Sequence, residues 1–212
     1  MIQRAISLLC LALVLTGAGC AGGRRSRSAP TPTVKKAYLP PPSSLKYEHP
    51  DEAMLEEIIR GQPILPAEIA RISDRMLTEG SVLNERTLAL LDIVLTKNLN
   101  GAPQEVRHRL LRNLGIIHYH QQKYNLARQE LQQANELFPR DGRTHFYLAR
   151  LAAHQGNIYQ RQGLSKKAKG QFNLAANEME LAQKLEPSND FYRQDLQKIL
   201  EIERSKTFSP KK

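Results

Sequence analysis

The side chains that most often carry out catalysis or bind metals are sparse in this chain of 212 residues. His118 and His120 lie two positions apart on a predicted helix, so they face different directions and cannot easily share a metal. The remaining histidines of the helical region have no carboxylate or cysteine at metal-binding spacing; they are His108, His145 and His154. The chain contains no P-loop, GxSxG, HExxH or CxxC motif. We therefore expect no enzymatic activity, no metal and no cofactor.

Both cysteines, Cys10 and Cys20, lie in the first twenty residues, so the rest of the chain has no thiol chemistry. A basic start and the apolar run 5–15, too short to span a bilayer, predict an export signal over residues 1–19. The small residues before Cys20 resemble the lipobox of bacterial lipoproteins, although Gly17 stands where that family usually has Leu. The resemblance implies that Cys20 is acylated and, because no Asp follows it, that the protein is sorted to the outer membrane. The alternative is an ordinary secretory peptide with an incidental cysteine.

Residues 20–50 predict a disordered tether, because six of the 12 prolines lie there and they cannot support a packed core. Residues 24–50 would reach on the order of 80 Å if fully extended as polyproline II. The tether is also basic, and its cations either contact anionic headgroups or are simply solvated; those before residue 40 are Arg24, Arg25, Arg27, Lys35 and Lys36.

The rest of the chain, about 160 residues, is long enough to form a domain with its own core. Helix-forming residues dominate it, and no stretch alternates between polar and apolar residues in the way that strands do. The sequence therefore predicts an all-α fold. The net charge of +10 indicates either a well-solvated surface or attraction to an acidic partner, a polyanion or anionic lipid.

Three helices are predicted within residues 51–102. The first covers residues 51–60 and carries apolar residues on one face. Pro66 opens the second and Gly80 closes it, as these residue types often do. The third begins at Asn84, a favourable N-cap residue, and has a strong leucine and valine stripe.

Residues 108–141 predict two helices folded back on each other, with a proline closing the unit. Their pattern resembles the tetratricopeptide repeat, a 34-residue helix–turn–helix unit that stacks into right-handed solenoids. The matching positions are Leu111, Leu114, Gly115, His118, Ala127, Leu131, Ala134 and Pro139, where His118 and Leu131 depart from the usual Tyr and Phe. The resemblance implies that the two helix backbones approach closely at Gly115 and Ala127.

Residues 142–189 look like a longer copy of this repeat. The copy ends with the same pattern, at Ala175, Met179, Ala182 and Pro187. Its middle is fourteen residues longer, which is two heptads, so each helix can gain one heptad and keep its face. We therefore predict a long hairpin of helices 142–162 and 165–186 in which Gly156 lies beside Ala168. The alternative is a loop inserted between helices of ordinary length.

Glycine and serine mark the turn of this hairpin, with Gly163 in the turn and Ser165 as the N-cap of the second helix. The tetratricopeptide-like domain is predicted to span residues 103–205. It would end in a capping helix at 190–205, with a disordered tail at 206–212.

The resemblance also implies a peptide-binding groove on the first helices of the repeats. Its positions in this sequence are Arg109, Arg112, Ile116, Tyr119, His120, Arg143, Phe146, Arg150, Ala153 and His154. Four arginines, two histidines and two aromatic residues with no acid among them predict a basic groove that would suit carboxylates. The alternative is that arginine is simply a frequent, soluble helix former.

Together these features predict a non-enzymatic scaffold for protein–protein interaction, anchored by lipid to the outer membrane and facing the periplasm. The layout is similar to that of lipoproteins that help pilus or secretin complexes assemble in the cell envelope. The alternative function is electrostatic binding of an anionic envelope polymer or lipid surface. No nucleic acid and no small-molecule substrate are expected.

Overall fold

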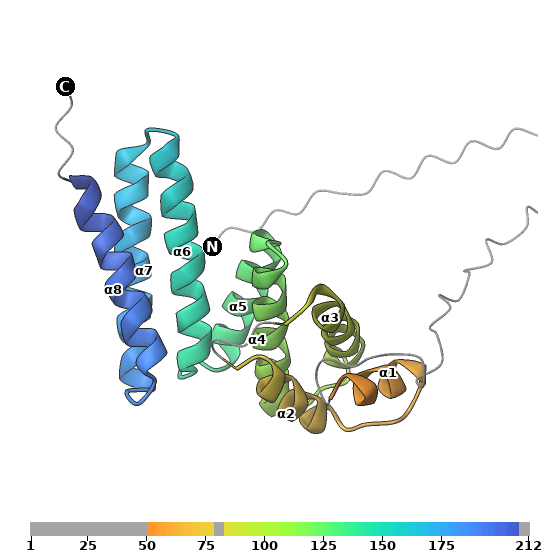
Figure 1. The fold of residues 1–212 in the computed structure, drawn as a ribbon. Coiled ribbons are helices and arrows are strands. Elements are labelled where there is room, and N and C mark those ends of the chain that lie inside the picture. The colour runs from red at the N-terminus through yellow and green to blue at the C-terminus, as the bar shows by residue number, and fades with distance from the viewer. Residues whose placement is uncertain (1–50, 79–82, 208–212) are drawn as a thin grey trace, which may run out of the picture. The chain divides into compact units, whose positions relative to one another are not determined.

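The computed structural model describes residues 51–78 and 83–207, and within these residues every regular element is an α-helix (Figure 1). The predicted all-α fold is confirmed for this part of the chain. The predicted signal peptide, Cys20 and the tether fall in residues 1–50, which lie outside the described residues, as do residues 208–212. None of the described helices is both long enough and apolar enough to cross a membrane.

The first two helices are α1 (Glu52–Arg60) and α2 (Pro66–Met76). Helix α1 ends at Gly61, whose φ of 114° lies in the left-handed region that favours glycine. Helix α2 has proline in its first turn, as predicted. It ends at Met76, before the expected end at Gly80, which lies outside the described residues. Leu77 is the residue after the helix, and its side chain is buried.

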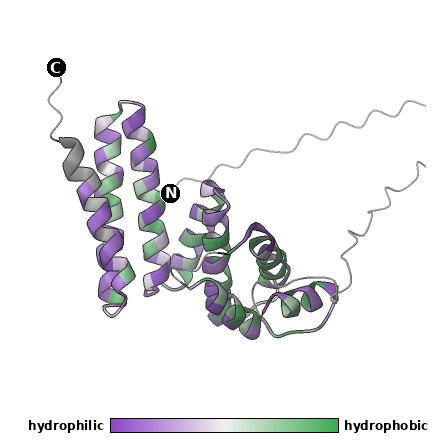
Figure 2. Cartoon of the chain, viewed as in Figure 1, coloured by the Kyte–Doolittle hydropathy of each residue, from purple (hydrophilic) through white to green (hydrophobic). Residues whose placement is uncertain are grey.

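Helix α3 (Glu85–Leu99) begins where the sequence predicts, because the side chain of Asn84 accepts a hydrogen bond from the backbone N–H of Thr87 at 2.7 Å. The helix packs against α1, α2 and α4. Its central position explains why Figure 2 shows α3 as mostly hydrophobic, whereas the described part of α8 is mostly hydrophilic.

Helices α4 (Gln104–His120) and α5 (Tyr124–Leu137) are joined by three residues and pack against each other. A Cβ atom added to Gly115 would lie 2.6 Å from Cγ of Leu131 and 3.2 Å from the carbonyl oxygen of Ala127. Both distances are shorter than van der Waals contact. The predicted close approach of the two helices at Gly115 and Ala127 is confirmed.

Helices α6 (Gly142–Arg161) and α7 (Ser165–Leu185) form the most extensive helix–helix contact in the described residues. Their ends agree within one residue with the predicted long hairpin, so no long loop is inserted between them. Gly156 is again a point of close approach, but the group nearest to it is the ring of Phe172, one turn after the predicted Ala168. A Cβ on Gly156 would lie 2.9 Å from that ring.

The turn between α6 and α7 contains Gly163 with a φ of 73°, as its predicted place in the turn requires. The prediction that Ser165 caps α7 is wrong. Leu164 occupies the N-cap position, and no side chain accepts a capping hydrogen bond there. Leu164 follows the left-handed Gly163 directly and takes the N-cap position, so Ser165 is already the first residue of the helix.

Helix α8 (Asp190–Thr207) packs against α7 and extends two residues past the predicted capping helix of 190–205. Tyr192 is its fully buried aromatic residue, and its ring stacks on Phe146 of α6 with centroids 4.7 Å apart. Phe191, the preceding residue, is half-buried and packs against the core.

One hydrophobic core runs through the described helices, which belong to a single compact unit. Leu91 and Leu95 of α3 join Leu114 of α4 in the same cluster that includes Met179 of α7 and Tyr192 of α8. The core therefore passes without interruption from the N-terminal helices into the region that resembles repeats.

Candidate functional site

Arg112, predicted to line the groove, is instead the centre of a buried polar network, and only 8% of it is exposed. Its guanidinium group donates to Asp141 at the start of α6, at 2.9 Å, and to Asp74 of α2. The neighbouring Asn113 donates to Asp74 at 2.7 Å, and Arg109 donates to the same carboxylate from its Nε atom at 3.0 Å. The network therefore fastens α2 and the start of α6 to α4.

The charge state of Asp74 follows from these contacts. Burial raises the pKa of this carboxyl group, but the charge of Arg112 and the hydrogen bonds from Asn113 and Arg109 outweigh burial. The pKa of Asp74 is therefore lowered, and the group is ionised when it is paired with the arginines. A carboxylate of this chain already occupies the position that an acidic ligand of Arg112 would need.

Three of the ten residues predicted to line the groove are buried, so the prediction of a groove that is open along all of them is wrong. Ile116 and Phe146 have no exposed surface, and Arg112 has almost none. The physical reason is that other helices cover this face. Helix α2 places Asp74 over the start of α4, and α8 places Tyr192 over Phe146.

Four other predicted groove residues do come together, in an open cleft where α4, α6 and α8 meet. We call this the α6–α8 cleft. It has a volume of about 260 Å³ and is lined by Tyr119, Arg150, Ala153, His154, Asn157, Asp195 and Lys198. The cleft therefore keeps part of the predicted surface and adds two charged residues from α8.

Arg150 is the central cation of the α6–α8 cleft. Its guanidinium carbon lies 5.2 Å from the ring centre of Tyr119 and 5.4 Å from that of Phe146, which is the range of cation–π contact. Its Nε atom lies 3.4 Å from a carboxylate oxygen of Asp195, and Lys198 lies 3.5 Å from the other oxygen. The guanidinium is thus held in place by rings and a carboxylate, while 31% of the side chain remains exposed.

Tyr119 and His154, the aromatic side chains that line the cleft, have shifted pKa values. Burial raises the pKa of Tyr119, and the neighbouring charge of Arg150 offsets only part of the rise. Burial lowers the pKa of His154, whose ring lies 4.0 Å from that of Tyr124, measured between centroids. At neutral pH Tyr119 is therefore a neutral hydrogen-bonding group, and the positive charge of the cleft comes from Arg150 and Lys198.

The other predicted groove residues lie outside this cleft. His120 contacts Tyr147, with its Nε2 atom 3.3 Å from the hydroxyl group, and burial and the charge of Arg150 lower its pKa. Arg109 pairs with Asp74 in the buried network. Arg143 is half-buried in the first turn of α6, at the opposite end of that helix from the cleft.

Two histidines of the described residues are paired with carboxylates that sequence reasoning did not connect to them. His118 lies 2.6 Å from Glu130 through Nδ1, and His145 lies 2.7 Å from Glu178 through Nδ1. The hydrogen bond to the glutamate raises the pKa of each histidine, against the opposing effect of burial. Each pair links the first helix of a hairpin to the second. No group of three or more His, Cys, Asp or Glu side chains suited to a metal ion occurs in the described residues.

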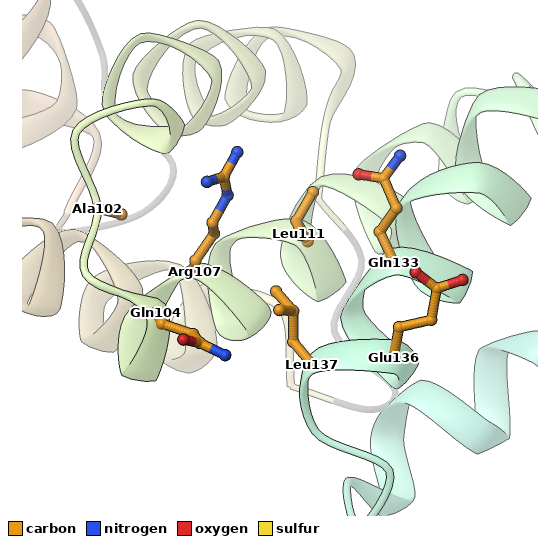
Figure 3. A pocket seen from close by; sticks show the side chains of 7 residues that line it. All are labelled: Ala102, Gln104, Arg107, Leu111, Gln133, Glu136 and Leu137. Atoms are coloured by element: carbon orange, nitrogen blue, oxygen red, sulfur yellow. The ribbon is translucent and has the colours of Figure 1, made fainter.

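A second cavity, of about 330 Å³, lies between the start of α4 and the end of α5 (Figure 3). Its lining residues are Ala102, Gln104, Arg107, Leu111, Gln133, Glu136 and Leu137. In Figure 3 the guanidinium of Arg107 and the carboxylate of Glu136 lie apart and do not converge. The cavity gathers amide and aliphatic side chains without a cluster of cations or rings, so the α6–α8 cleft is the better candidate.

Sequence reasoning missed Asp74 and Asp195, the acids that face the predicted groove. Each is separated from its arginine by about forty residues and belongs to a helix outside the repeat pattern, so no local signal links them. No protein-family model matches the chain, and no curated protein matches it.

Proposed function

We propose that this chain is a non-enzymatic scaffold that binds a protein partner through the α6–α8 cleft. The observation that carries the proposal is the cleft itself, in which Arg150, Lys198 and Tyr119 border an open surface. Aromatic rings and arginine are the residue types that contribute most to protein–protein affinity.

The helix pairs α4–α5 and α6–α7 support a tetratricopeptide-like arrangement. Each pair consists of two helices joined by a three-residue turn, and each has a glycine on its first helix where the second helix comes closest. In this proposal the pairs stack as a right-handed solenoid, with α8 as the terminal cap. The cleft then lies on the first-helix face, where such solenoids hold extended peptides.

The proposed partner presents a carboxylate to Arg150. Two cations and one carboxylate of this chain face the cleft, and the guanidinium fork of the partly exposed Arg150 suits the planar geometry of an aspartate, a glutamate or a chain terminus. Asp195 occupies one edge of the guanidinium, so it competes with an incoming acid. An acidic peptide segment that passes between α6 and α8 fits this chemistry.

We further propose that Cys20 carries a lipid and anchors the chain to the outer membrane, with the helical part in the periplasm. The basis is the export-like start and the small residues before Cys20. Such an anchored scaffold would help a cell-envelope complex to assemble. Mass spectrometry of the exported protein tests the anchor, since Cys20→Ser should remove the lipid and release the protein from the membrane.

Crosslinking in the native envelope, followed by mass spectrometry, tests partner binding. Arg150→Gln should reduce capture of the partner about tenfold or more, because a charge-assisted hydrogen bond contributes about 1.5 to 3 kcal/mol. Asp195→Asn should increase capture, because it removes the internal competitor. Arg140→Gln, at an exposed position between α5 and α6, is the matched control and should have no effect.

The opposite signs of the two cleft variants make the test specific. A fold defect would lower capture in both variants, whereas competition for Arg150 predicts a decrease in one and an increase in the other. If Arg150→Gln and Arg140→Gln capture the same partner equally well, the cleft is not the binding site. Arg112 is unsuitable for this test because its substitution would break the buried network.

A further inference from the structure

The turn between α6 and α7 carries a concentration of positive charge that the α6–α8 cleft does not use. Four cations occur within nine residues, and all are exposed; they are Arg161, Lys166, Lys167 and Lys169. No acidic residue occurs between Asp141 and Glu178. In the described residues no carboxylate forms an ion pair with any of these four side chains. We call the four cations together with Leu164 the hairpin tip.

The hairpin tip projects beyond the neighbouring helix pair. Residues 122–126, which include the end of the α4–α5 turn, lie beside residues 154–158 of α6, as both line the same surface pocket. The last turn of α6 and the first turn of α7 therefore extend past that neighbour, as Figure 1 shows. A projecting, convex element is suited to touch a broad surface rather than to enclose a small ligand.

The lysines of the hairpin tip are placed against the helix dipole. Lys166 and Lys167 lie in the first turn of α7, which contains no acidic residue, although the partial positive charge at a helix N-terminus favours acids there. Lys167 makes a favourable cation–π contact that offsets part of this cost, with its ammonium group 5.7 Å from the ring centre of Tyr159. Charges that oppose local stability are expected where they serve a function.

An apolar side chain stands among these cations. Leu164 lies at the apex of the turn and is 40% exposed, although it is a large hydrophobic residue. We propose that the hairpin tip binds an anionic bilayer surface, with the lysines and Arg161 against the headgroups and Leu164 inserted at the interface. Clusters of four or more cations next to an apolar anchor are attracted to anionic lipids in this way.

The exposed leucine favours a bilayer over a nucleic acid or another soluble polyanion. Cations alone would satisfy a polyanion, and an apolar apex would gain nothing from contact with phosphates in water. At a bilayer the same leucine leaves water. The contact is separate from the α6–α8 cleft and does not rest on the proposed partner binding.

Vesicle co-sedimentation of the full chain tests this inference. The probes are phosphatidylcholine vesicles with and without phosphatidylglycerol, and the measured quantity is the ratio of the two partition coefficients, which cancels binding by the apolar residues 5–15. The triple variant Lys166→Gln, Lys167→Gln and Lys169→Gln should lower the ratio about a hundredfold, from the attraction expected per cation. Leu164→Ser should lower partition into the anionic vesicles about tenfold.

The matched control removes the same charge elsewhere, through Lys97→Gln, Arg140→Gln and Lys184→Gln, which are exposed and have no ion-pair partner in the described residues. It should change the ratio less than threefold. The tip variant should keep or raise the thermal unfolding midpoint, because it relieves the dipole conflict in α7, and it should leave capture of a protein partner unchanged.

Equal losses in the tip and control variants would overturn the inference. Binding to heparin but not to anionic vesicles, with no effect of Leu164→Ser, would also overturn it and indicate a soluble polyanion.

Discussion

Alanine substitution of two glycines tests the close packing of α4 against α5. Gly115 lies at the contact between the two helices, and Gly170 lies on an exposed face of α7, where an added Cβ would meet nothing within 4 Å. Both residues are in helix interiors and neither has a positive φ. The two substitutions therefore share the gain in helix propensity and differ in the space available to the new methyl group.

The expected magnitudes follow from the distances. Gly→Ala in a helix interior stabilises by about 1 kcal/mol, which should be the whole effect at Gly170. At Gly115 the new Cβ would be 2.6 Å from Cγ of Leu131, about 1 Å closer than a favourable carbon–carbon contact. Leu131 is fully buried and Cγ is its branch point, so the helices must separate. Overpacking of this kind costs about 1 to 3 kcal/mol.

Urea unfolding followed by far-UV circular dichroism measures both free energies. We expect Gly115→Ala to be about 1 to 3 kcal/mol less stable than Gly170→Ala, with similar m-values. The double variant Gly115→Ala with Leu131→Ala should lose about 0.5 kcal/mol or more less stability than the sum of the two single losses, because the two residues are in contact. Equal stabilisation by the two single substitutions would refute the close approach of α4 and α5.

Three further outcomes follow from the buried contacts. Asp74→Asn should destabilise the fold by roughly 3 kcal/mol in urea unfolding, because it leaves Arg112 short of one carboxylate; a change below about 0.5 kcal/mol would show that the network is not formed. His118→Gln should flatten the pH dependence of unfolding. Because the pKa of His118 is raised in the folded protein, its bond to Glu130 stabilises the fold fully below about pH 6.5. This stabilisation is lost as pH rises through the pKa of folded His118, so the wild type should be more stable than the variant at low pH and lose that difference between neutral and alkaline pH. Tyr192→Ala should cost about 3 to 5 kcal/mol in the packing of α8, and limited proteolysis should then remove this helix first; uniform cleavage along the chain would contradict the inference.

The candidate site was predictable only in part. The family-like spacing along α4 and α6 selected Tyr119, Arg150 and His154, and these side chains do share the α6–α8 cleft. The same spacing also selected Ile116 and Phe146, which are fully buried. Spacing along a helix identifies which residues share a face, but it does not show whether another helix covers that face.

The sequence by itself determined the helices and most of their ends. Helix-forming residues without strand-like alternation predicted an all-α fold, Pro66 and Asn84 marked the starts of helices, and the repeat-like pattern around Gly115 implied a close approach. Such signals work because capping, left-handed glycine and helix periodicity act within a few residues of the chain. Only the tertiary structure decided which carboxylate meets which arginine. Asp74 reaches Arg112 across 38 positions of sequence, a pairing set by how the helices pack rather than by any local pattern.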